Sequence, residues 1–219
     1  MSRFKQPLSP VSRLSDRIGG GADKRPILIS SAYTTAAQNW GDFAPAGIQA
    51  GDLIVAVRGR IITDPVTPTG YTQAQFAVNG NDKCKLLWRV ATGDASDGFS
   101  NEASAITSVL VFRNHGGFGQ TAKQELAAAG AASLTLSSMP DADSVVLAGL
   151  ARSNMSFAYG GGGQAEAGIG WTPAVTSGGA SNGNHVLARL AKRPPATIIN
   201  LRFTESTIRA LVVAEILPK

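Results

Sequence analysis

The chain has 219 residues, of which 43% are hydrophobic and 16% are charged, so it can fill a core and has a less ionic surface than most cytosolic enzymes. This composition excludes a chain that is disordered throughout, and the single Cys84 excludes an intrachain disulfide and a multi-cysteine zinc site. The net charge of +5 is uneven, because six basic and two acidic residues give residues 1–26 a charge of +4 and leave +1 for the rest.

A nearly neutral body without a basic, aromatic-rich stripe argues against nucleic-acid binding. No apolar run approaches the roughly 18 residues that a helix needs to cross a bilayer, so membrane insertion is not expected either.

Residues 1–26 are predicted to form an extended basic arm. They contain three prolines and the run Gly19-Gly20-Gly21, and their apolar residues are isolated, so the segment cannot bury a face by itself. We expect this arm to anchor the protein to a partner and a single domain to occupy residues 27–219. The candidate anchoring residues are the basic ones, Arg3, Lys5, Arg13, Arg17, Lys24 and Arg25.

From Ile27 onward, apolar and polar residues alternate, which is typical of strands with one buried face. In the segment 84–90, the even-numbered side chains are expected to face a core, and Lys85 and Arg89 to face water. The same alternation predicts further strands, with buried side chains at Ile106, Leu110, Phe112, Leu134, Leu136, Val186, Ala188, Leu190, Ile199, Leu201 and Phe203.

Two continuous apolar runs, Leu53–Val57 and Leu211–Val213, predict central strands covered on both faces. Short strands separated by turn-forming residues favour an all-β fold, an antiparallel β-sandwich of jelly-roll-like type. The segment Thr121–Ala129 is rich in Ala, Gln, Glu and Lys and predicts one short helix at most. The expected core scaffold is Leu53, Val55, Trp88, Phe112 and Phe203.

No residue set predicts a defined catalytic mechanism. Gly179–Gly183 fits the G-x-S-x-G pattern around Ser181, but no helix follows it and Gly and Ser surround it, so we interpret it as a loop. His115 and His185 are the only histidines, and neither has the spacing of a metal ligand. The acidic pairs Asp94/Asp97 and Asp141/Asp143 are interpreted as solvated turn residues. We therefore expect no enzyme, no metal and no cofactor, and a serine esterase is the least favoured alternative.

The glycine-rich segment 153–184 is too long for an ordinary connector in a compact domain, and such loops commonly carry function. Its aromatic residues Tyr159 and Trp171 are candidates for stacking against sugar rings or for contact with a neighbouring subunit. Packing of both side chains onto the sandwich is the alternative.

Four short segments occur in a familiar order: Ala50–Val57, Pro68–Thr72, Leu87–Asp94 and Val109–Arg113. Together, over residues 47–113, they resemble phage and gene-transfer-agent virion proteins, chiefly the small β-sandwich domains of head or tail fibres, spikes and their bases. The resemblance implies a structural virion protein, a fibre, spike or decoration subunit, and it carries no catalytic residue onto this chain.

The partners expected from this resemblance are capsid, portal or tail subunits, and the expected location is the virion. A homo-oligomer is also expected, with a trimer favoured, because closed symmetry would cover the edge strands of a sandwich. The alternative function is a carbohydrate-binding module that recognises a host surface polysaccharide through Tyr159 and Trp171. This alternative is compatible with a virion location.

Overall fold

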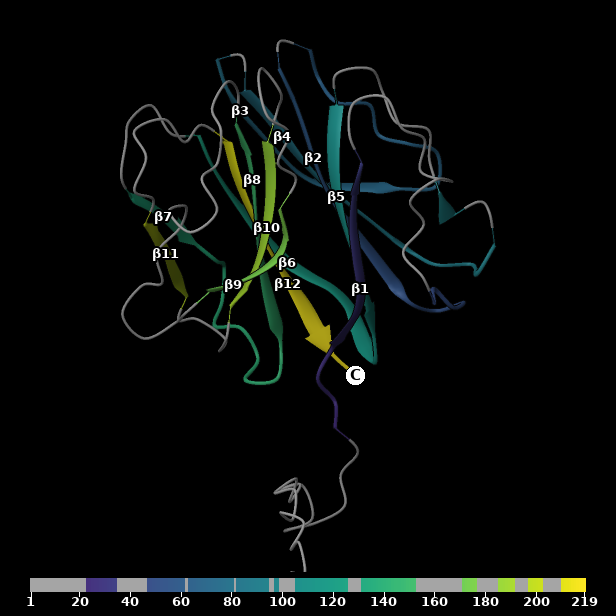
Figure 1. The fold of residues 1–219 in the computed structure, drawn as a ribbon. Helices are drawn as coiled ribbons and strands as arrows, with labels where there is room; N and C mark the ends of the chain where they lie inside the picture. Colours follow the sequence, from purple (N-terminus) through teal and green to yellow (C-terminus); the bar gives the residue numbers. More distant parts are fainter. Residues whose placement is uncertain are drawn as a thin grey trace, which may run out of the picture.

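Two five-stranded antiparallel sheets pack face to face in the computed structural model (Figure 1). The structure describes residues 23–34, 47–61, 63–80, 82–94, 97–98, 105–125, 131–152, 171–176, 185–191, 197–202 and 210–219. The all-β antiparallel sandwich predicted from the sequence is therefore confirmed.

The first sheet has the strand order β1-β5-β2-β4-β3, and the second has the order β6-β12-β8-β10-β9. Strands β11 and β7 form a separate two-stranded sheet. The first sheet contains β1 (Ile27–Thr34), β2 (Leu53–Ile61), β3 (Thr72–Asn79), β4 (Asp82–Val90) and β5 (Ala105–Arg113). The other strands are β6 (His115–Glu125), β7 (Ala131–Thr135), β8 (Val145–Arg152), β9 (Trp171–Thr176), β10 (His185–Ala191), β11 (Ile198–Arg202) and β12 (Ala210–Pro218).

The short helix predicted at Thr121–Ala129 is wrong over its described part. Residues 121–125 belong to β6, and among the described residues there is no α-helix. Helix-favouring side chains are overridden here because β6 pairs along its length with β12, and each backbone hydrogen bond of that ladder depends on an extended conformation.

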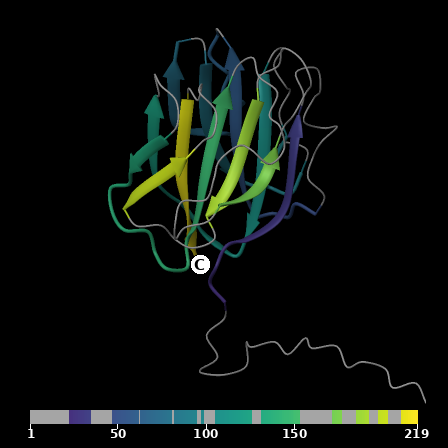
Figure 2. The same cartoon turned by 60° about the vertical axis from the view of Figure 1, so that its left-hand side comes forward.

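Asn114 alone separates β5 from β6 and so links the first sheet to the second. Its φ of 57° lies in the left-handed region, which Asn tolerates better than most residues. The first half of the chain thus builds one sheet before the chain enters the other (Figure 2).

Crossover connections cover the outer face of the first sheet. Because neighbouring strands are antiparallel, β1 runs parallel to β2, β2 to β3, and β4 to β5, so each of these connections passes over an intervening strand. Their described parts place Ile48, Tyr71 and Ala91 against the outer side chains Ile54, Ala56, Leu87, Val109 and Val111. The central strands of the first sheet, β5, β2 and β4, are therefore buried on both faces.

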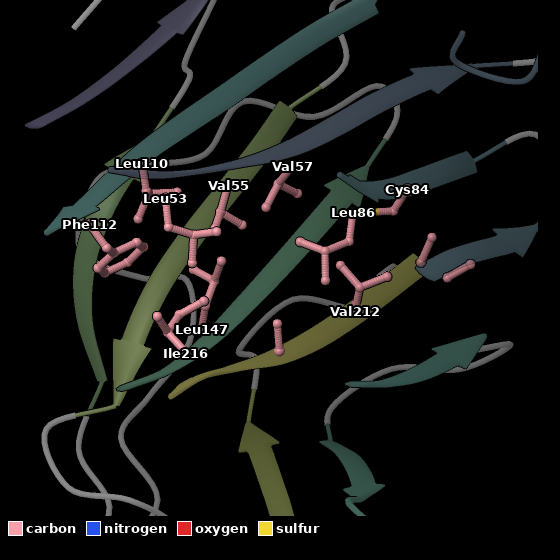
Figure 3. Packing of buried hydrophobic residues seen from close by; sticks show 13 residues of the cluster. Leu53, Val55, Val57, Cys84, Leu86, Leu110, Phe112, Leu147, Val212 and Ile216 are labelled. Carbon is pink, nitrogen blue, oxygen red and sulfur yellow. The ribbon is translucent and has the colours of Figure 1, made fainter. Parts of the chain in front are cut away.

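The core lies between the two sheets (Figure 3). Leu53, Val55 and Phe112 are fully buried in it, as expected, whereas Trp88 is only partly buried and stacks on Phe118 at 5.5 Å between ring centroids. Phe203 lies outside the described residues. Other core side chains are Val57, Cys84, Leu86, Leu110, Leu147, Val212 and Ile216. β2 and β12 are interior strands, as predicted for their apolar runs.

The alternation in β4 was interpreted wrongly at both of its charged positions and at one end. Lys85 is 7% exposed, and the side chain of Arg89 is 10% exposed, because the crossovers cover the face on which both lie. Burial lowers the pKa of Lys85, whose ammonium lies 5.0 Å from the centroid of the Phe76 ring. Val90, expected inside, is 47% exposed at the end of the strand.

Gly149 of β8 allows the two sheets to approach each other closely. A Cβ at this position would lie 2.7 Å from both γ-methyl groups of Val57 on the facing sheet. We expect Gly149→Ala to lower the free energy of unfolding by about 1–3 kcal/mol, the usual cost of overpacking a core. Denaturant unfolding measures this change. In a Val57→Ala background the same substitution should cost clearly less, and an equal cost in both backgrounds would contradict the proposed overlap.

Candidate functional site

The described N-terminal residues and the C-terminal strand meet at one end of the sandwich, as Figure 1 and Figure 2 show. We call this end the terminal junction; it comprises residues 23–26, 47–52, 113–115 and Lys219. The backbone N–H of Lys219 donates to the carbonyl of Lys24 at 2.8 Å. The side-chain amide of Asn114 donates to the carbonyls of Asp23 and Arg25. The last residues of the predicted arm are therefore fixed to the body.

An ion pair between the buried carboxylate of Asp52 and the partly exposed guanidinium of Arg113 forms the centre of the junction. Arg113 Nε donates to Asp52 Oδ1 and Arg113 Nη2 to Asp52 Oδ2, each at 2.8 Å, and the backbone N–H of Gln49 also donates to Oδ2. Burial acts to raise the pKa of Asp52, but the bonds from Arg113 and Gln49 outweigh it and hold that pKa below its ordinary value. Arg113 Nη2 also donates to the carbonyl of Gly47 at 3.0 Å.

A second buried carboxylate fixes the segment after β4. Asp97 Oδ1 and Oδ2 accept from the backbone N–H groups of Thr92 and Gly93, each at 2.8 Å, and Oδ1 lies 3.2 Å from Arg89 Nη2. The hydroxyl of Tyr71 donates to the Asp97 carbonyl at 2.6 Å. Burial raises the pKa of Tyr71. Asp97 was expected to be solvated, and it is buried because it satisfies these donors.

A third buried carboxylate, Glu215 of β12, holds the connection between β7 and β8. It accepts from the Ser144 hydroxyl at 2.6 Å, from Gln120 Nε2 at 2.9 Å and from the backbone N–H of Asp141 at 3.1 Å. Asp52, Asp97 and Glu215 therefore each fix a connection between strands in place.

A depression of about 360 Å³ opens at the terminal junction. Its described lining is polar and contains no hydroxyl or thiol side chain that could act as a nucleophile. His115 Nε2 lies 2.9 Å from the Gly51 carbonyl oxygen, which can only accept, so this nitrogen carries a proton. The lining residues are Gln49, Ala50, Gly51, Asp52, Arg113, Asn114, His115 and Lys219.

The structure places only part of the predicted arm. Arg3, Lys5, Arg13 and Arg17 lie outside the described residues. Lys24 and Arg25 lie at the junction, where Arg25 Nε is 3.3 Å from Asp143 Oδ1 and 3.7 Å from Asp23 Oδ1.

The residues predicted for sugar binding and for the esterase are not brought together by the described part of the chain. Tyr159 and Ser181 lie outside it, and His185 is the first residue of β10. Trp171 is the first residue of β9, an edge strand, where its backbone pairs with Ala191. A sugar-binding role for Trp171 stays a prediction.

Comparisons with protein-family models, with curated proteins and with solved structures find no match to this chain. Among the described residues, no three His, Cys, Asp or Glu side chains are grouped so that they could hold a metal ion. The described residues also include no helix that is long and apolar enough to span a membrane.

Replacement of Asp52 by Asn removes the carboxylate that Arg113 and Gln49 bind. We expect this variant to lower the free energy of unfolding at pH 7 by about 2 kcal/mol, the typical size for hydrogen bonds to a charged group. Because the folded-state pKa of Asp52 lies below the ordinary 3.8, the stabilisation is present above about pH 4 and disappears as the pH falls through the folded-state pKa.

Denaturant unfolding of the wild type and of Asp52→Asn between pH 2 and pH 7 checks this expectation. The difference between them should be constant near neutrality and shrink below about pH 4. Asp64→Asn is the matched control, since the Asp64 side chain is 59% exposed and its pair with Lys83 should contribute less than about 1 kcal/mol. A difference for Asp52→Asn that stays undiminished at pH 2 would show that the carboxylate's charge is not what stabilises the junction.

Proposed function

We propose that the protein is a structural, non-enzymatic subunit of a phage-like particle, a fibre, spike or decoration protein of the head or tail. Its partners in this proposal are capsid, portal or tail subunits, which bind its basic N-terminal arm. The similarity of residues 47–113 to virion β-sandwich domains motivates the proposal. All four similar segments contribute to the first sheet or to the connections that cover it.

The observation that carries the proposal is the position of the arm's last residues. Asp23–Pro26 are fixed at the terminal junction by Asn114 and by the Lys219–Lys24 hydrogen bond, so the predicted arm reaches the body at that end. A subunit attached to a particle through this end would present the opposite end of its sandwich outward (Figure 2).

The contacts of the buried carboxylates Asp52, Asp97 and Glu215 also favour a structural role. An enzyme usually brings ionisable groups with perturbed pKa values together in a cleft. Here Asp52, Asp97 and Glu215 lie in three separate hydrogen-bond networks, and each network fixes a connection between strands. These carboxylates accept hydrogen bonds from donors that the fold itself supplies.

The trimer is part of the same proposal, and its support is the resemblance to fibre and spike domains. A need to cover edge strands gives little support, because the described edges carry their own irregularities. β1 has a register shift between Leu28 and Ser30, β3 has one between Gln73 and Gln75, and the pairing of β9 shifts at Pro173. Such bulges and prolines protect an edge without a partner.

Deletion of residues 1–22 tests the anchoring role. We expect the truncated protein to keep its thermal unfolding midpoint within about 3 °C, because the contacts of residues 23–26 with the body remain. It should be missing from purified particles, as measured by mass spectrometry relative to the major capsid protein.

Two full-length variants separate the sources of binding. A variant in which Gln replaces Arg3, Lys5, Arg13 and Arg17 keeps the length of the arm but removes four positive charges. Loss of this variant from particles would indicate that the arm binds acidic residues of the partner through its charges. Its retention would indicate that the arm binds by adding a strand to a sheet edge of the partner. Lys123→Ala, which changes an exposed side chain of β6, should be incorporated normally. A normal copy number for the truncated protein would refute anchoring by the arm.

A further inference from the structure

We propose that the terminal junction is a docking surface for an acidic segment of a partner protein, one of whose carboxylates enters the depression beside Arg113 and Lys219. This inference deepens the proposed function and rests on it, since it names the chemistry of the surface against which the anchored end of the sandwich lies.

The depression has the size and lining for a charged side chain. Its volume of about 360 Å³ is many times the roughly 30 Å³ that a water molecule occupies in the liquid. Arg113 is one of the lining residues, and its guanidinium is already held in one orientation by Asp52 and Gly47. A guanidinium fixed in this way loses little side-chain freedom when it binds a second acceptor.

Arg113 still has donors to offer. Its bonds to Asp52 and Gly47 use Nε and Nη2, and Nη1 makes no hydrogen bond with any described residue. The Arg113 side chain is 38% exposed, although the carboxylate that it binds is 3% exposed. The ion pair therefore hides its negative member and shows its positive member to solvent.

Basic side chains outnumber acidic ones around the depression. Lys219 lines the depression, and the exposed residue Lys24 is joined to it by the hydrogen bond between their backbones. The nearby carboxylates of Asp23 and Asp143 both lie within 4 Å of Arg25 and are therefore partly neutralised. The four basic side chains Lys24, Arg25, Arg113 and Lys219 outnumber the three acidic ones, Asp23, Asp52 and Asp143, by one, so the side chains at this end carry a net charge of +1. A positive depression of this kind attracts carboxylates and repels basic partners.

The sides of the sandwich are less suited to partners. Bulges interrupt β1 and β3, β9 contains Pro173, and β6 has register shifts near Gly116 and Gly119. The Glu125 carboxylate also accepts from the backbone N–H of Val78 on the β3 edge. Because irregular edges resist the addition of a strand, an end of the sandwich is the better contact surface.

A fluorescein-labelled hexaglutamate peptide tests the proposal with the purified full-length protein at low salt. Fluorescence anisotropy should show binding that is at least tenfold weaker for Lys24→Glu/Lys219→Glu. A matched control, Arg3→Glu/Lys5→Glu, changes the net charge equally but alters only the arm, and it should weaken binding less than threefold. In amide spectra, the largest shifts should occur at Gly51, Arg113, Asn114 and His115.

Two results would overturn the proposal. One is equal weakening of hexaglutamate binding in both double variants, which would indicate that the peptide is attracted to the overall charge of the protein. The other is unchanged binding of the peptide to Lys24→Glu/Lys219→Glu. Hexaglutamine should not bind, and if it binds as well as hexaglutamate, the carboxylate is not recognised. The peptide assay uses the isolated protein, so it can fail while arm-dependent incorporation into particles succeeds, and the two proposals are tested separately.

Discussion

The bidentate bond between Asp52 and Arg113 is the interaction on which the terminal junction depends. It joins the connection that precedes β2 to the last residue of β5, immediately before the chain turns at Asn114 into the second sheet. Asp97 and Glu215 act in the same way elsewhere, since each accepts hydrogen bonds from backbone N–H groups of a connection. Without the carboxylate these N–H groups would have no partner. A sandwich with long crossovers thereby keeps its connections in fixed positions against the sheets.

Alternating polarity was enough to predict the fold class, because a strand with one buried face has a period of two whatever its neighbours are. It failed at Lys85 and Arg89, whose face of the sheet is covered by crossovers that local sequence does not reveal. Helix propensity gave the other wrong prediction, at Thr121–Glu125, where pairing with β12 decided the conformation. Both errors come from long-range contacts, which a window of a few residues cannot include.

The site was predictable only in part, for the same reason. The composition of residues 1–26 indicated a basic arm, but its contacts at Asp23 and Arg25 depend on Asn114, some ninety residues away. Asp52 and Arg113 were both visible in the resemblance, one near its start and the other at its end. Nothing in their spacing showed that they bind each other, because the pair forms only when β2 and β5 lie side by side.

The single-residue link at Asn114 has a consequence for how the chain folds. Every strand of the first sheet precedes it, so that sheet can pair fully before any residue of the second sheet has left the ribosome. Until the second half arrives, the apolar inner face of Leu53, Val55 and Phe112 has nothing to cover it. The nascent chain is therefore most prone to aggregation while the residues after Asn114 are being synthesised. A chaperone that binds extended apolar surfaces would be needed most at that stage.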